Sequence, residues 1–389
     1  MPATNSQVAP AQEAGRPQPQ TTIEPPGGPF IRHSQSGRRP QYTIAGQAFG
    51  NLITQPLVAA PGYARKLRLQ FQAASSTLSA ASLATSGDAP YSAVSLVTLR
   101  DAFGTPLIVG PGWEIFKALP KYGGQFGLHA VSDPNNLPSF IAPGSGASGA
   151  SAYQFSSVLP LEFAKAYGCI SMANASLLPT LQIQMAASAA VYASAASGTA
   201  GTFTVNNELD FYWLPEGVAM EPPGLGTTCQ WVLQVANPSI ASAASQLVAL
   251  PRLGGYLSSL TFIFRDSTNA RSDLMFPTQR IRIYVDGVPL VDTLLATLQD
   301  DMQIQFAGAA SAQWTRDTGV LALTRKTSMN QESLGLLDTG EEYLSTNPGT
   351  LIQVEGSPWG SFANTPGTLN AIVGQVVPAG SLIQGLPEL

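Results

Sequence analysis

Three segments of this chain recur in the same order, and this internal repeat limits the fold more than any other feature. The pairs are residues 55–61 (QPLVAAP) with 246–251 (QLVALP), 101–108 (DAFGTPLI) with 286–291 (DGVPLV), and 179–183 (PTLQI) with 348–354 (PGTLIQV). Their offsets are about 191, 183 and 170 residues, a drift that loops of unequal length would produce. Ordered agreement of three pairs indicates that one structural unit of about 170 residues occurs twice.

The segments around these repeats alternate between apolar and polar residues, which is the pattern of half-buried β-strands. Sustained helical periodicity is absent, and only residues 161–167 and 340–344 suggest a helical turn or two, close to Pro or Gly. The chain is therefore predicted to be all-β. The clearest alternating segments are 66–72, 94–99, 181–185, 209–213, 260–264 and 280–285.

Many strands joined by long, unequal loops favour a jelly roll over an immunoglobulin-type sandwich, which has fewer residues and shorter loops. We therefore predict two tandem eight-stranded jelly rolls behind an extended N-terminal arm. A turn-rich stretch at 215–224 marks the boundary between the copies. The predicted divisions are a flexible arm at 1–41, a first jelly roll at 42–218 and a second jelly roll at 219–389.

The composition suggests a protein that buries much of its surface against other subunits. Apolar residues make up 44% of the chain, but charged residues make up only 11%, against about 25% in an average soluble protein. Interfaces lose Lys, Glu and Asp first, so extensive self-assembly is the simplest interpretation. The net charge of −5 argues against a protein that grips nucleic acid along a basic face, and no sequence-specific nucleic-acid binding is expected.

The first 39 residues are rich in Pro, Gln and Gly and cannot form a core. Up to Pro40 this arm holds four arginines and two glutamates, so it is positive while the rest of the chain is negative. Its candidate contact residues are Arg16, Arg32, Arg38 and Arg39. A merely solvated tail is the alternative.

With its tandem repeat, its arm before the first strand and segments such as LIQVEGSPWG at 351–360, the chain resembles the double jelly-roll major capsid proteins of the tectivirus and adenovirus-hexon lineage. The resemblance covers residues 42 to the C-terminus. It implies a viral coat protein whose pseudo-hexagonal homotrimers tile the icosahedral capsid of a non-tailed virus, with a bacteriophage among the expected sources. Penton and minor capsid proteins are the further partners it implies.

Relatives commonly enclose a membrane, with the arm on the inner side. Pro2, Pro10, Pro17 and Pro19 would interrupt an amphipathic helix here, so direct membrane insertion of the arm is not expected. The arm's arginines would instead meet lipid headgroups, acidic partner proteins or the next capsomer. Because the N-terminal residues lack the apolar segment of a secretory signal, we expect assembly in the host cytoplasm.

Catalytic and cofactor motifs are missing from the sequence. It holds no GxxxxGK[ST], HExxH or GxSxG pattern and no cluster of Cys and His, so an enzyme, a cofactor and a metal site are not expected. The GxGxxG match at 144–149 lies in an Ala/Ser/Gly loop instead of a βαβ unit. His33 and His129 are taken as surface or hydrogen-bonded histidines, and the acid pairs at 300–301 and 341–342 as solvated rather than cation-binding.

Two further residue classes bear on the alternatives. Cys169 and Cys229 are expected to be free, largely buried thiols, with a disulfide as the alternative. The five tryptophans are expected in the core or between subunits, although exposed aromatics would also suit carbohydrate stacking. The competing function is thus a jelly-roll receptor- or carbohydrate-binding spike, with a cupin-type enzyme a distant third. The five tryptophans are Trp113, Trp213, Trp231, Trp314 and Trp359.

Overall fold

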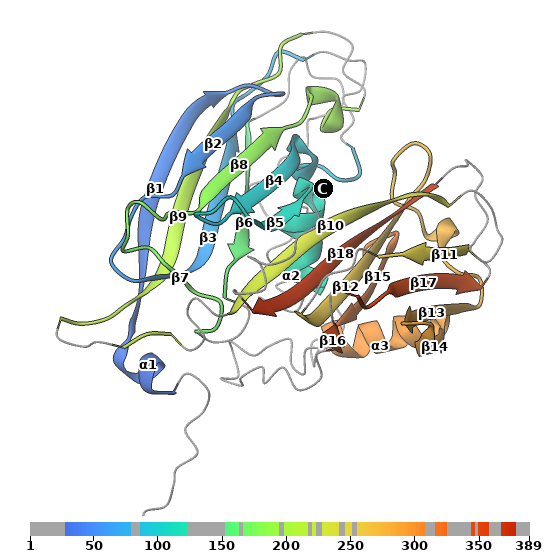
Figure 1. Ribbon diagram of the computed structural model, residues 1–389. Coiled ribbons are helices and arrows are strands. Elements are labelled where there is room, and N and C mark those ends of the chain that lie inside the picture. Colours follow the sequence, from blue (N-terminus) through green and yellow to red (C-terminus); the bar gives the residue numbers. More distant parts are fainter. Residues whose placement is uncertain are drawn as a thin grey trace, which may run out of the picture.

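The computed structural model of the protein shows two β-rich bodies side by side, one of blue to green strands and one of yellow to red strands (Figure 1). The structure describes residues 28–78, 86–122, 152–162, 166–193, 198–216, 220–222, 228–240, 246–250, 255–307, 316–324, 344–346, 349–357 and 367–378.

The first body contains eight main strands in two sheets. They are β1 (Gln35–Gln47), β2 (Leu52–Pro56), β3 (Tyr63–Ala73), β4 (Val94–Arg100), β5 (Pro106–Gly110), β6 (Tyr153–Pro160), β8 (Thr180–Met185) and β9 (Phe203–Trp213). One sheet has the order β1-β9-β3-β6 and the other β2-β8-β4-β5. With the strands lettered B to I along the chain, these are the BIDG and CHEF sheets of a jelly roll.

The second body repeats this arrangement strand for strand. Its strands are β10 (Thr228–Ile240), β11 (Gln246–Ala249), β12 (Gly255–Arg265), β13 (Arg280–Val285), β14 (Val288–Leu294), β15 (Val320–Thr324), β17 (Ile352–Ser357) and β18 (Gly367–Pro378). The orders β10-β18-β12-β15 and β11-β17-β13-β14 are again BIDG and CHEF. Even the short extra strands match, since β7 (Ile170–Ser171) and β16 (Leu344–Thr346) pair with the first residues of the two D strands. The predicted fold of two tandem eight-stranded jelly rolls is confirmed.

The three repeated segments occupy equivalent places in the two rolls. The first pair includes residues of the C strands β2 and β11, the second forms the turn from E to F and the start of F, and the third lies at the H strands β8 and β17. The repeat therefore reports a true structural duplication.

Alternating residues of the strands fill the core. In β3 the side chains of Leu67, Leu69 and Phe71 are buried, and the polar residues between them point outward. An irregularity between Ala64 and Lys66 shifts the pairing with β9, which moves the buried positions from even to odd numbers. Phe71 stacks on Phe155 of the neighbouring strand β6 with ring centroids 4.7 Å apart. Within the described residues, one apolar cluster extends through both rolls.

The first strand begins earlier than predicted. The arm was expected to reach residue 41, but α1 (Gly28–His33) and β1 precede that point. β1 lies at a sheet edge and pairs with β9 along most of its length, so Arg38 and Arg39 belong to a strand instead of a flexible arm. Pro40 is tolerated because edge strands and irregular positions can lack an N–H donor. Alternation did not reveal this strand because most of its side chains are exposed.

Helices follow the F strand in each roll, and the sequence did not predict them. In the first roll β5 is followed by the π-helical η2 (Glu114–Ala118) and by α2 (Leu119–Tyr122), and in the second β14 runs directly into α3 (Leu295–Ala307). Of the described side chains of α3, only Leu298 and Met302 are buried, a stripe too short to stand out. The helical turn predicted at 161–167 is not formed by its described residues, 161–162 and 166–167, and of 340–344 only Leu344 is described, in β16. The remaining short elements are the 3-10 turns η1 (Tyr91–Ala93), η4 (Ser188–Ala190) and η5 (Asp273–Met275).

The uncharged stretch at 166–207, which lacks the sustained apolar run of a membrane span, folds in its described part as strands, turns and short loops that include β7, β8 and the start of β9. Among the described residues no helix is long and apolar enough to cross a bilayer.

Candidate assembly surfaces

The two jelly rolls share one continuous sheet. β5, the F strand at the edge of the first roll, pairs in parallel with β10, the B strand of the second, through Ile108 opposite Val232 and Val109 opposite Leu233. This joins the CHEF sheet of one roll to the BIDG sheet of the next (Figure 1). Because the sheet continues across the junction, the two rolls are held in a fixed orientation.

A buried charge cluster reinforces this junction. Arg265, at the end of β12, is 4% exposed and contacts two acids of the first roll. Its guanidinium donates to Asp88 at 2.6 Å and to Glu114 at 2.8 Å. Arg271 donates to the other oxygen of Asp88 at 2.6 Å. Two arginines of the second roll thus meet two acids of the first.

Trp113 completes this cluster from the first roll. The centre of its buried ring lies 4.2 Å from the guanidinium carbon of Arg271, which is a cation–π contact between the rolls. Trp113 therefore packs inside the protein, as expected for the tryptophans.

A second set of contacts joins the helical segment of the first roll to Asp317, just before β15. The Tyr122 hydroxyl donates to the Asp317 carboxylate at 2.8 Å and accepts from the Asp317 backbone N–H at the same distance. Lys117 Nζ lies 3.3 Å from the other carboxylate oxygen. Because these groups are far apart in sequence and show no short motif, sequence reasoning missed both sets of contacts.

A smaller apolar cluster anchors the start of the described chain to the base of the first roll. Phe30 of α1 is buried and meets the rings of Tyr63 and Tyr212 edge to face, at 5.6 and 5.4 Å. Ala166 and Cys169 belong to the same cluster. The chain is thus held before its first strand begins.

Buried Glu162 lies beside this cluster and accepts three hydrogen bonds. They come from Arg65 Nε at 2.7 Å, the Tyr212 hydroxyl at 2.7 Å and the backbone N–H of Ala166 at 2.5 Å. The Arg65 guanidinium also lies 4.3 Å from the centre of the Tyr212 ring. Ala166 has a φ of +66°, an uncommon conformation for alanine that the hydrogen bond to Glu162 holds in place.

Cys169 is a free, buried thiol, which confirms the expectation for this residue and excludes its pairing with Cys229. Burial, together with the nearby Glu162 charge, raises the pKa of the Cys169 thiol well above its usual value.

Because the thiolate is the reactive form, we expect Cys169 to resist iodoacetamide at pH 8 in the folded protein and to react in urea. Peptide mass spectrometry that follows only the Cys169 peptide checks this. Rapid labelling without denaturant would contradict the buried placement.

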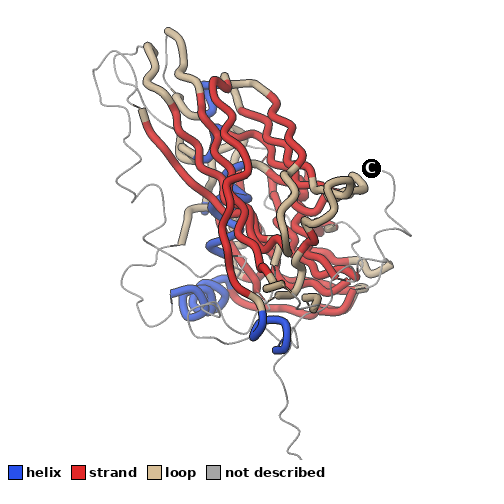
Figure 2. Tube along the Cα trace, turned by 90° about the vertical axis from the view of Figure 1, so that its left-hand side faces the viewer, coloured by secondary structure: helices blue, strands red, loops and turns tan. Residues whose placement is uncertain are grey.

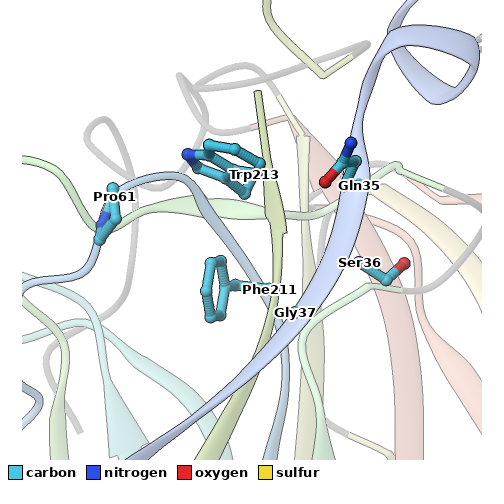
Figure 3. A pocket seen from close by; sticks show the side chains of 6 residues that line it. All are labelled: Gln35, Ser36, Gly37, Pro61, Phe211 and Trp213. Atoms are coloured by element: carbon cyan, nitrogen blue, oxygen red, sulfur yellow. The ribbon is translucent and has the colours of Figure 1, made fainter. Parts of the chain in front are cut away.

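A shallow hollow lies where β1 begins and β9 ends (Figure 3). It has a volume of about 240 Å³ and contains no titratable side chain. Gly37 pairs directly with Phe211, whose ring covers the glycine so closely that a Cβ would lie 3.0 Å from it. Trp213 is 40% exposed. The lining residues are Gln35, Ser36, Gly37, Pro61, Phe211 and Trp213.

Three of the four candidate arginines lie within the described residues. Arg16 lies outside the described residues, and Arg32 is exposed on α1. Arg38 donates to Asp210 at 2.7 Å and lies 3.8 Å from Glu208, across the β1–β9 pair. Arg39 is exposed on β1. Their partners outside the chain stay a prediction.

Several other predictions concern residues that the structure does not describe: the 144–149 glycines, His129, the 341–342 acids, Trp314, Trp359 and the side chain of Trp231. His33 is exposed at the end of α1. Asp300 and Asp301 are exposed on α3, and no group of metal ligands occurs within the described part of the chain.

Comparison with known proteins finds the same fold in solved structures. No protein-family profile and no curated protein matches the sequence. Solved structures match along nearly the whole chain, and those named below are double jelly-roll major capsid proteins of non-tailed icosahedral viruses.

The major capsid protein of Sulfolobus turreted icosahedral virus superposes with a TM-score of 0.60 at 17% identity, covering 90% of this chain and 100% of its own. VP54 of PBCV-1 gives 0.61 at 11% identity, covering 88% and 93%. The major capsid protein P2 of bacteriophage PM2 gives 0.51 at 8% identity, covering 88% and 98%. The chain has the double jelly-roll fold of these capsid proteins.

Proposed function

We propose that this protein is a structural major capsid protein that self-assembles into the shell of an icosahedral virus and resides in the virion capsid. The observation that carries the proposal is the tandem pair of equivalent jelly rolls, joined in one chain and matched by a capsid protein over 90% of its length. A shell tile needs a fixed shape, and the shared sheet with its buried ionic contacts supplies it.

The assembly unit we propose is a homotrimer. Three copies of a chain with two similar rolls present six similar bodies around a threefold axis, an outline close to a hexagon, which tiles a surface. The role is structural instead of catalytic. Assembly in the host cytoplasm, contacts with penton and minor capsid proteins, and contacts of the arm with an internal membrane belong to the same proposal. Arg16, Arg32, Arg38 and Arg39 are its candidate residues for contacts on the inner face.

The competing proposal, a receptor- or carbohydrate-binding spike, draws on exposed aromatic residues. Trp213 and Tyr256 are 40% and 49% exposed. The capsid role is favoured because the matched structures share the complete pair of rolls, whereas a single roll would be sufficient for a binding module.

The mass of the purified protein in solution tests the proposal. Light scattering should give three times the chain mass of 40.6 kDa, together with larger closed species under assembly conditions. A protein that stays monomeric and binds glycans measurably would overturn the capsid role and support the spike.

A further inference from the structure

The junction between the two rolls uses one F strand and one B strand, and the other F and B strands of the chain each have a sheet edge without a partner among the described strands. Within the chain, the F strand of roll 1 (β5) pairs with the B strand of roll 2 (β10). Of the described strands, β14, the F strand of roll 2, pairs only with β13, and β1, the B strand of roll 1, pairs only with β9. Each molecule thus carries one free F edge and one free B edge.

The free F edge exposes a leucine whose equivalent is buried at the internal junction. When the repeated Pro-Leu pairs are aligned, Pro106 and Leu107 of β5 correspond to Pro289 and Leu290 of β14. Leu107 is 4% exposed, whereas Leu290 is 44% exposed. Val288 and Leu294 of β14 are 66% and 47% exposed. This apolar exposure is what an F strand without its B partner would show.

The free B edge has the dimensions of its counterpart. β1 and β10 each contain 13 residues. A long edge strand with unpaired backbone groups is a liability that proteins normally cover. In Figure 1, β1 lies at the left-hand side of the molecule and β14 at the lower right, so the two free edges face away from each other.

The two edge regions also carry opposite charge. Residues 28–47, which span α1 and β1, contain three arginines and no acid, and residues 288–307, which span β14 and α3, contain three aspartates and no Lys or Arg. The helices α1 and α3 lie toward the same end of the molecule in Figures 1 and 2. Opposite charges near the same end of the molecule favour contact between two copies that stand side by side.

We propose that β14 of one copy pairs with β1 of the next, repeating the β5–β10 junction between subunits. This inference rests on the proposed capsid function and names the contact that would close its trimer. The contact is head to tail, and such contacts form closed rings when the rotation between subunits allows it. With β5–β10 joining the rolls within each chain, three copies give six equivalent F-to-B junctions around the ring.

The register of the new contact follows from the internal one. Val232 is the fifth residue of β10 and Arg39 is the fifth residue of β1, so these two positions correspond. The repeated Pro-Leu aligns Ile108 of β5, the residue after Leu107, with Val291 of β14, the residue after Leu290. The ladder pair Val232–Ile108 therefore maps onto Arg39 of one copy and Val291 of the next. This places Arg39 beside Asp292, which already lies near Arg280 and Arg282 at 3.0 and 3.4 Å.

Cross-linking with a short bis-maleimide tests this contact. Chains with both Arg39→Cys and Val291→Cys should give covalent trimers on a denaturing gel, and a mixture of the two single variants should give covalent dimers. Each single variant alone should give no more than the wild-type background, because a head-to-tail contact never brings two copies of one residue together. A chain with Arg39→Cys and Leu52→Cys is the matched control, since Leu52 is 60% exposed on β2, an edge strand outside the proposed contact.

A substitution gives an independent readout. Leu290→Asp should convert trimers to monomers in light scattering, whereas Leu52→Asp should leave the trimers intact. Wild-type trimers that show no 39–291 cross-link and survive Leu290→Asp would overturn the edge pairing and leave the capsid function standing. A monomeric wild-type protein would overturn both proposals.

Discussion

Replacing Arg265 with alanine is expected to lower the free energy of unfolding by about 3–5 kcal/mol, because breaking a buried ion pair leaves charge without compensation. The substitution removes the shared partner of Asp88 and Glu114, which Arg265 contacts at 2.6 and 2.8 Å. The Glu114 side chain is only 2% exposed, so water cannot readily replace the lost contact.

Urea unfolding at one fixed protein concentration measures this loss. Arg100→Ala is the matched control, since Arg100 is a partly exposed residue of β4 whose guanidinium donates to the backbone of Gly104 at 2.9 Å. The control should change stability by about 0.5 kcal/mol or less, as surface substitutions usually do. If Arg265→Ala were as mild as the control, the buried cluster would not be what holds the rolls together.

Replacing Glu162 with alanine is the second change with a large expected effect, a loss of about 3–5 kcal/mol in the free energy of unfolding. The carboxylate accepts from Arg65, Tyr212 and the backbone of Ala166, and its removal leaves three donors without this acceptor at the base of the first roll. Losing the contact at Ala166 also frees a residue held at positive φ.

Glu208→Ala provides the comparison for Glu162→Ala. The Glu208 side chain is 46% exposed and lies 3.8 Å from Arg38, so its loss should cost about 0–1 kcal/mol. Thermal or urea unfolding of both variants measures the loss in the free energy of unfolding that each substitution causes. Equal stability of the two variants would show that the hydrogen bonds to Glu162 contribute little.

The sequence predicted the fold class because the alternation within a strand and the similarity between repeated segments can both be recognised in short stretches of sequence. The segments 66–72 and 260–264 lie in β3 and β12, and the repeated segments lie on equivalent strands of two rolls. Both rolls bury one face of most strands, so the period of two survived in the sequence.

The prediction failed where few side chains of an element are buried or where contacts join residues far apart in the sequence. β1 is an edge strand with mostly exposed side chains, and its alternation is therefore weak. The helix α3 buries too short a stripe to be recognised. Arg265 lies 177 residues from Asp88 and 151 from Glu114, and no spacing rule brings such residues together.

The candidate arginines show the same limit of prediction from the sequence. Arg38 and Arg39 stood out as part of a basic arm, but only the strand pairing shows that they belong to a free sheet edge. The sequence supplied their charge, and the fold supplied the acidic edge that could oppose them on another copy, at β14 and α3.

Electron cryo-microscopy of the purified, assembled protein tests the central claim most directly. The account predicts particles built from three chains, with six jelly-roll bodies around a threefold axis and the two rolls of each chain joined through β5 and β10 as they are here. Particles that contain a single chain, or whose two rolls take up variable orientations, would contradict it.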